Sequence, residues 1–192
     1  HIYNNRCNLF IRFAMNASKE SSMNRGKVIF LNGVTSSGKT SIVKAIQSRE
    51  DVFCYAVSFD MFEDAIPGQY ADNEACYSEA ILAMYHAAQK FSELGKNVLI
   101  DGLIMNLTGL ENHYNVVLEV FDGYPLEIIE VYCPLEICRQ RNVARGDRKE
   151  DQSEKQHRIM DKSVRYSYSI DTSILSVAES VEAIVRRSLR GQ

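Results

Sequence analysis

Gly33-Val34-Thr35-Ser36-Ser37-Gly38-Lys39-Thr40 matches the phosphate-binding pattern G-x-x-x-x-G-K-[ST] at every fixed position. The apolar run 28–31 precedes this loop like a buried strand, and residues 41–46 follow it with apolar side chains at helical spacing. Strand, glycine loop and helix is the order that a phosphate-binding loop requires. The stretch therefore predicts a nucleotide site rather than a glycine-rich turn that matches the pattern by chance.

The residue types of the loop suit a phosphate chain. Gly33 and Gly38 let the backbone curve round an anion, so that successive N–H groups and the helix N-terminus point at it. Lys39 can reach the β- and γ-phosphates, and the Thr40 hydroxyl can bind a Mg²⁺ ion held by the same phosphates. We expect nine consecutive residues to bind the nucleotide, namely Gly33, Val34, Thr35, Ser36, Ser37, Gly38, Lys39, Thr40 and Ser41.

Length and composition favour one domain without a membrane span. The 192 residues suffice for one well-buried domain but not for two comfortable ones. With 22 Lys and Arg against 25 Asp and Glu, the net charge of -3 gives no reason to expect a nucleic-acid or anionic-membrane partner. No apolar run approaches the roughly 20 residues of a membrane helix. Five cysteines without a C-x-x-C pair favour reduced thiols and a cytoplasmic location.

The first 24 residues read as a leader outside the core. They are rich in asparagine, and Arg12 interrupts their one apolar cluster, unlike the centre of a secretory signal. Met23 and Met15 are candidate initiators, which would make the preceding residues an extension that is not native. We expect a poorly ordered leader over residues 1–24 and a single phosphate-loop domain over residues 25–192.

Two aspartates stand at the carboxyl ends of predicted strands. Asp60 follows the strand expected over residues 52–57, and Asp101 lies near the end of the strand expected over residues 97–102. Ligands of open α/β sheets bind beyond these strand ends, so both carboxylates should face the phosphate loop. Spacing leaves Asp60 as either a helix N-cap or a catalytic base. Asp101 is either a magnesium ligand or part of an Asp-Gly turn, and the strand context favours the metal.

Arginines gather where Gly146 ends a predicted helix. Arg141 and Arg145 are four residues apart and share a helix face, so that with Arg148 they can converge on a polyphosphate as a closing lid. Such a lid would stabilise charge on a transferred phosphoryl group and exclude water. The alternative is a solvated basic helix end that offsets the helix dipole. The phosphate loop in the same chain favours the lid.

The remaining segments continue an alternation of helices and strands. A long helix is expected from Asp72, with an apolar stripe that ends at Leu94. Further strands are expected over residues 126–133 and 168–172. Strands that alternate with helices predict a parallel sheet.

The last predicted helix opens on a capping box. Ser176 and Glu179 form this box, and Val177 begins the apolar stripe behind it. Asp171 and Thr172 lie at the end of the fifth strand. They either border the nucleotide or form the turn before the cap, and the spacing does not choose between these roles.

Taken together, these motifs resemble the chloramphenicol phosphotransferase family of small-molecule kinases. Three stretches carry the resemblance: the phosphate loop with Ser36-Ser37-Gly38-Lys39, the Asp60 stretch ending in Ala65-Ile66-Pro67, and Arg141-x-x-x-Arg145-Gly146-Asp147-Arg148 continuing through Lys155-Gln156 to Tyr166 and Asp171-Thr172-Ser173. The third stretch is the most specific. The likeness extends loosely from about residue 27 to residue 185 and omits the leader.

The resemblance implies a three-layer α/β P-loop NTPase of the nucleotide-kinase type, with a five-stranded parallel sheet flanked by helices and an Arg-rich lid. It implies ATP- and Mg²⁺-dependent transfer of the γ-phosphoryl group to a hydroxyl of a small molecule. It also favours catalysis for Asp60, because the family's motif has the base for the acceptor hydroxyl at the matching position. The expected site then has catalytic residues Asp60, Lys39, Arg145 and Arg148, further nucleotide contacts from Arg141, Arg145, Asp171 and Thr172, and magnesium ligands Thr40 and Asp101.

The chain departs from the family's pattern at three positions. Asp161 stands where a histidine usually follows the Lys-Gln pair, Ser167 stands where an aspartate is frequent, and Gly102 replaces a second acidic residue. The acceptor is therefore either chloramphenicol or another small alcohol. A nucleoside or metabolite kinase of the same architecture is the alternative, followed by a non-catalytic ATP-binding regulatory module. The chain has no Asn-Lys-x-Asp motif, which a GTP switch would need.

Overall fold

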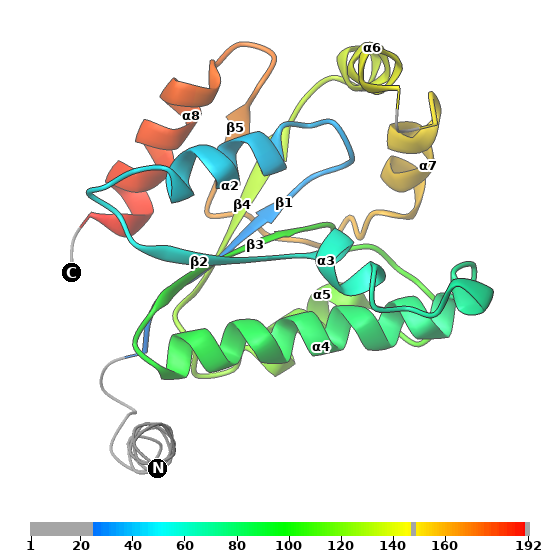
Figure 1. The fold of residues 1–192 in the computed structure, drawn as a ribbon, viewed down its shortest axis with the longest axis horizontal. Coiled ribbons are helices and arrows are strands. Elements are labelled where there is room, and N and C mark those ends of the chain that lie inside the picture. Colours follow the sequence, from blue (N-terminus) through cyan, green and yellow to red (C-terminus); the bar gives the residue numbers. More distant parts are fainter. Residues whose placement is uncertain (1–24, 147–148, 191–192) are drawn as a thin grey trace, which may run out of the picture.

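A computed structural model describes residues 25–146 and 149–190, so the predicted leader and Arg148 lie outside the described residues. In chain order the elements are β1 (Val28–Asn32), α2 (Lys39–Gln47), β2 (Cys54–Ser58), α3 (Phe59–Glu63), η2 (Gly68–Tyr70), α4 (Glu74–Glu93), β3 (Asn97–Gly102), α5 (His113–Val120), β4 (Leu126–Tyr132), α6 (Leu135–Arg145), α7 (Gln152–Ile159), β5 (Tyr168–Asp171), α8 (Val177–Ile184) and η3 (Val185–Leu189). Strands and helices alternate through most of the chain, as the sequence predicts (Figure 1).

The five strands form one parallel sheet in the order β2-β3-β1-β4-β5. Strand β1 lies at the centre, where Leu31 pairs with Asp101 of β3 and with Ile129 of β4. Ser58 of the edge strand β2 pairs with Asp101 from the other side. Because the strands are parallel, their carboxyl ends meet at one edge, which brings the residues after β1, β2 and β3 together.

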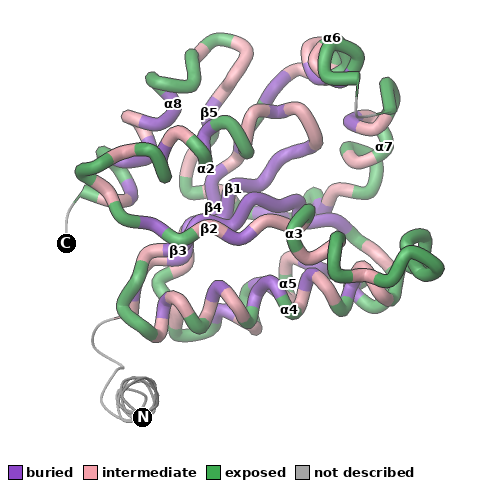
Figure 2. Tube along the Cα trace, in the orientation of Figure 1, coloured by how far each residue is buried: buried purple, intermediate pink, exposed green. Residues whose placement is uncertain are grey.

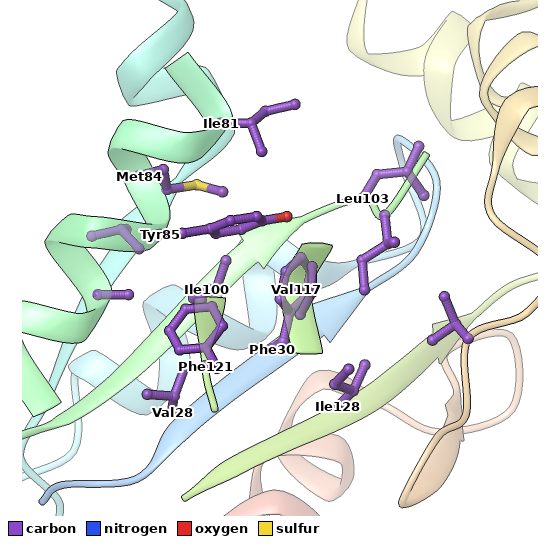
Figure 3. Packing of buried hydrophobic residues seen from close by; sticks show 14 of the residues in the cluster. Val28, Phe30, Ile81, Met84, Tyr85, Ile100, Leu103, Val117, Phe121 and Ile128 are labelled. Carbon is purple, nitrogen blue, oxygen red and sulfur yellow. The ribbon is translucent and has the colours of Figure 1, made fainter. Parts of the chain in front are cut away.

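Helices cover both faces of the sheet and complete the predicted three layers. Helices α2 and α8 lie on one face, and α4 and α5 lie on the other, while α6 and α7 stand beside the sheet (Figure 1). Side chains of β1 alternate between the two cores, so all five of its residues are buried (Figure 2). On the α4 face, Phe30 and Ile100 pack with Tyr85 and Phe121 (Figure 3).

The helix ends follow their capping residues. The side chain of Asn73 accepts hydrogen bonds from the first turn of α4, so this helix begins at Glu74 rather than at Asp72. The predicted capping box of Ser176 and Glu179 is confirmed at the start of α8. No helix in the described ranges is both long and apolar enough to cross a membrane.

Two positions that the sequence assigns to buried stripes are exposed. Leu94 keeps 45% of its surface exposed, because α4 ends one residue earlier and Gly95 turns the chain with a φ of 72°. Val177 keeps 43% exposed, because it is the first residue of α8 and borders a cavity. Helical periodicity fails at both positions since each lies at a helix end.

Phe30 should contribute far more to stability than the exposed Phe53. Phe30→Ala opens a cavity between β1 and α4, and we expect it to lower the free energy of unfolding by about 3–5 kcal/mol. Phe53 is 64% exposed, so the matched variant Phe53→Ala should cost less than about 1 kcal/mol. Urea unfolding followed by circular dichroism gives both values, and equal losses would contradict this assignment of the core.

Candidate active site

A cavity of about 510 Å³ lies at the carboxyl ends of the strands. The phosphate loop and the first turn of α2 form its base, and residues after β2, β3 and β5 form its sides. Residues of α6 and α7 also line it. The cavity therefore joins segments that lie up to about 150 residues apart in the sequence, where parallel sheets bind their ligands.

The glycines of the loop occupy positions that exclude a side chain. A Cβ atom on Gly33 would lie 2.4 Å from the Val131 carbonyl oxygen and 2.7 Å from the Ser37 hydroxyl. Gly38 has a φ of 106° and is the N-cap of α2, so the first N–H groups of that helix stay available at the cavity. The backbone at both glycines can therefore curve closely round an anion.

Most of the predicted nucleotide-binding stretch faces the cavity. Its lining residues are Gly33, Thr35, Ser36, Gly38, Lys39, Thr40 and Ser41. Val34 and Ser37 are buried behind the loop instead, and Val34 packs against Cys133 and Cys138. These two residues support the loop from beneath, so any contact that they make with a ligand has to come from their backbone.

The ammonium of Lys39 lies across the loop. Its Nζ donates hydrogen bonds to the carbonyl oxygens of Gly33 at 2.7 Å and Val34 at 3.0 Å, and it lies 3.8 Å from Asp101 Oδ1. A cation held by two neutral carbonyls and one carboxylate can exchange these contacts for stronger ones with phosphate oxygens.

Thr40 and Asp101 form a pair at the floor of the cavity. The Thr40 hydroxyl donates to Asp101 Oδ2 at 2.6 Å, and Asp101 is 8% exposed. Asp101 and Gly102 both belong to β3, so the alternative of an Asp-Gly turn is wrong. Hydroxyl and carboxylate oxygens suit Mg²⁺. The described residues contain no cluster of three or more His, Cys, Asp or Glu side chains that could hold a metal ion alone, so phosphate and water would supply the other ligands.

Asp60 lies in the first turn of α3 and lines the same cavity. The cap of this helix is Ser58, whose Oγ accepts a hydrogen bond from Met61 N at 3.3 Å. The alternative of Asp60 as the N-cap is therefore wrong. Its exposed carboxylate shares this part of the cavity with the apolar side chains of Phe59 and Leu103.

The arginines of α6 divide between two faces. Arg141 and Arg145 line the cavity, and α6 ends at Gly146, which has a φ of 72°. Arg139 lies on the outer face, where its Nε donates to Glu150 at 2.7 Å. Arg139 therefore fits the solvated alternative, whereas Arg145 lines the cavity and is also exposed at the helix end.

Arg141 also ties three segments together. Its guanidinium donates to the Ser36 carbonyl oxygen at 3.2 Å and to the Thr172 carbonyl oxygen at 2.8 Å. The Thr172 hydroxyl in turn donates to the Ser37 carbonyl oxygen at 2.6 Å. The end of β5 is therefore fastened to the phosphate loop, with Arg141 holding both.

Asp171 and Thr172 have different surroundings. Thr172 lines the cavity, whereas Asp171 does not. Asp171 Oδ1 accepts hydrogen bonds from the N–H of Ser173 at 2.8 Å and from its hydroxyl at 2.5 Å. This is the geometry of an Asx turn, so Asp171 forms the turn before the cap. A contact of Thr172 with the nucleotide stays a prediction.

Three buried or half-buried residues to which the sequence assigned no role contact Thr35 and Ser36 of the loop. Asn142 of α6 accepts from the Ser36 hydroxyl at 2.7 Å and donates to Ser153 of α7 at 2.8 Å. Ser153 donates to the Thr35 carbonyl oxygen at 3.1 Å, and Gln156 accepts from Thr35 N at 2.6 Å. In the sequence they look like ordinary polar positions of surface helices, and only the presence of Gln156 in the family-like motif singles one of them out.

Residues 103–106 follow β3 and form a wall of the cavity through Leu103. Asn32 Oδ1 accepts from Ile104 N at 2.7 Å, while its Nδ2 donates to the Tyr166 hydroxyl at 2.7 Å. Burial raises the pKa of Tyr166 to about 12, so it stays neutral near pH 7. The wall is thus attached to the buried end of β1.

A buried histidine supports the same wall from behind. Burial lowers the pKa of His113, so its imidazole is neutral at pH 7. Its Nδ1 lies 2.8 Å from the Met105 carbonyl oxygen and 3.1 Å from the Met105 backbone nitrogen, and its Nε2 lies 2.7 Å from the Tyr85 hydroxyl. Asp161, where the family usually has histidine, accepts from Tyr114 N at 3.0 Å. It therefore supports the backbone and does not line the cavity.

Comparisons with known proteins agree on this fold. The model of the family described as chloramphenicol phosphotransferase-like protein matches residues 26–189. A Mycobacterium tuberculosis protein, named only as a candidate O-phosphotransferase, is 26% identical over 185 residues, which cover 83% of this chain and 80% of that protein.

Solved kinase structures share the architecture at low identity. The Mycobacterium tuberculosis APS kinase, solved with AMPPNP and APS, has a TM-score of 0.63 and 17% identity, and the match covers 84% of this chain and 96% of that chain. Shikimate kinase from Bacteroides thetaiotaomicron has a TM-score of 0.57 and 16% identity, covering 83% and 96%. These likenesses show the fold alone.

The closeness of Gly33 to β4 predicts that this position tolerates no side chain. Gly33→Ala must displace the Val131 backbone, and we expect it to lower the free energy of unfolding by about 1–3 kcal/mol. Gly68→Ala is the matched control, because no atom lies within 4 Å of its added Cβ and its φ is not positive. Thermal unfolding of both variants tests this, and an unchanged midpoint for Gly33→Ala would disprove it.

Proposed function

The chain belongs to the chloramphenicol phosphotransferase-like family, and we propose that it transfers the γ-phosphoryl group of ATP to a hydroxyl of a small molecule. Family membership places it among the small-molecule phosphotransferases. One observation carries the finer proposal: a single cavity combines the phosphate loop, the Asp60 carboxylate and two arginines of α6. These are the groups that phosphoryl transfer needs, a phosphate cradle, a base and positive charge.

The phosphates of ATP would lie along the loop and the N-terminus of α2. Backbone N–H groups and Lys39 would neutralise the β- and γ-phosphates. Arg145, which lines the cavity from the end of α6, would stabilise the charge that spreads over the phosphoryl oxygens during transfer. Arg141 would keep the loop and the end of β5 in position through its contacts with Ser36 and Thr172.

A magnesium ion fits the Thr40 and Asp101 pair. The two oxygens are already 2.6 Å apart, and Asp101 is fixed by strand pairing on both sides. Bound there with the phosphates, Mg²⁺ would neutralise charge on the β- and γ-phosphate oxygens. Thr40 would supply a hydroxyl ligand, and Asp101 would hold the ion directly or through its water ligands.

The adenine base would pack against the apolar part of the cavity lining. Ala144 of α6 and Leu175 and Val177 near the start of α8 contribute to this lining. This assignment accounts for the exposure of Val177, because an apolar side chain at the rim of the cavity can pack against the base.

Asp60 is the proposed base. The acceptor hydroxyl would give its proton to the Asp60 carboxylate while its oxygen attacks the γ-phosphorus and the bond to the ADP oxygen breaks. Phe59 and Leu103 flank this region, so the acceptor would meet an apolar surface beside the base. Of the three departures from the family's pattern, Gly102 alone lines the cavity, which leaves the identity of the alcohol open.

Asp60→Asn should retain ATP binding and lose transfer. An amide cannot take the proton, so we expect the turnover number to fall by about 10²–10⁴-fold while the affinity for ATP changes little. Asp64→Asn is the matched control, since Asp64 is exposed at the end of α3 and does not line the cavity. Turnover of Asp60→Asn near the wild-type rate would rule out this base.

Turnover has to be measured with a panel of possible acceptors. ATP consumption is followed across small alcohols that include chloramphenicol, nucleosides and sugars, and the phosphorylated product is identified by mass. If the protein binds ATP and no acceptor stimulates turnover, the enzyme proposal fails and an ATP-binding module becomes the better account.

A further inference from the structure

Gln156 contributes a hydrogen-bonding group to the cavity that the proposed mechanism does not use. Its Oε1 accepts a hydrogen bond from Thr35 N at 2.6 Å. The facing atom of the side chain must be the oxygen, because Thr35 N–H is a donor. The Nε2 group has no protein partner within the described residues, and the side chain lines the cavity. Its two N–H donors are thus available to a ligand.

Helix α7 contacts both the phosphate loop and the segment after β3. Gln156 contacts Thr35, which belongs to the phosphate loop. The C-terminal end of α7 is joined to the wall at residues 103–106, where Asn106 N donates to the Ile159 carbonyl oxygen and Asp161 N donates to the Ile104 carbonyl oxygen, both at 2.9 Å. Gln156 therefore lies on a helix that is fixed at both the phosphate loop and residues 103–106, and it shares the cavity with Asp60.

We propose that Gln156 is a catalytic residue that contacts the transferred phosphoryl group. This inference rests on the proposed function. Oε1 holds Thr35 N–H, and this bond turns the Nε2 donors toward an oxygen of the γ-phosphoryl group. A neutral amide donor fits here, because Lys39 and Arg145 already supply the positive charge. The contact exists with ATP and is absent with ADP, so Gln156 also gives the site its preference for the triphosphate.

Gln156→Glu isolates the proposed contact. The carboxylate keeps an oxygen for Thr35 N–H but replaces the two Nε2 donors with an oxygen that repels phosphate. The affinity for ATP, measured by calorimetry with Mg²⁺ and without acceptor, should fall by about 10- to 100-fold. The affinity for ADP should change by less than about threefold. The turnover number should fall together with the affinity for ATP.

Gln152→Glu is the matched control. It makes the same amide-to-carboxylate change one helical turn earlier on α7, at a residue that does not line the cavity. The ratio of ATP to ADP affinity should stay at the wild-type value in this variant. If this ratio falls in both variants, the added negative charge causes the effect and the proposal is wrong.

Other outcomes separate this inference from the function on which it rests. If the wild type binds ATP and phosphorylates an acceptor but Gln156→Glu keeps the same ATP to ADP ratio, the inference is wrong and the function stands. If the wild type binds no ATP, both fail. If Gln156→Glu does not fold, Gln156→Met replaces it as the test. Methionine removes the two N–H donors without adding charge, so this variant must also lose the preference for ATP over ADP.

Discussion

The site depends on the complete burial of strand β1. All five residues of this strand are buried, with β3 and β4 paired on its two sides and a helical layer on each face. The residue that follows, Gly33, lies so close to the Val131 backbone that it has no room for a side chain. Consequently the first residue of the phosphate loop cannot move without displacing the centre of the sheet. This rigidity gives the loop N–H groups a fixed direction before any ligand binds.

The outer side of the loop is held differently, by side chains from distant helices. Asn142, Ser153 and Gln156 contact Thr35 and Ser36, and Arg141 connects Ser36 to Thr172. Two of these side chains, Asn142 and Ser153, are fully buried, where an unpaired polar group would be costly. Helices α6 and α7 therefore act as one unit with the loop. A displacement of either helix would break several of these bonds and alter the shape of the phosphate site.

Local sequence patterns predicted the phosphate-loop side of the site, because residues close in the sequence set its geometry. The loop motif lies between a strand and a helix, and Asp101 ends an apolar strand, so both were placed correctly in the fold. The prediction of Asp60 as a base depended on the family resemblance, because spacing alone does not reveal that Ser58 caps α3. Asn142 and Ser153 were missed because their burial arises from the docking of two helices on the loop. No sequence window contains that information.

Residues 103–106 depend less on the sheet for their position than the phosphate loop does. Residues 103–106 lie beyond the end of β3. They are positioned chiefly by the side chains of Asn32 and His113 and by the backbone N–H of Asp161, which donates to the Ile104 carbonyl oxygen. His113 and Asp161 lie outside the strands, so their contacts could be exchanged for other hydrogen-bonding pairs without changing a strand residue, whereas Asn32 belongs to β1. The donor half must therefore stay constant for the fold to bind a nucleotide, whereas the acceptor half can change through a few side chains. This difference explains why the motifs of this chain define the phosphate-loop side of its site closely and leave the acceptor open.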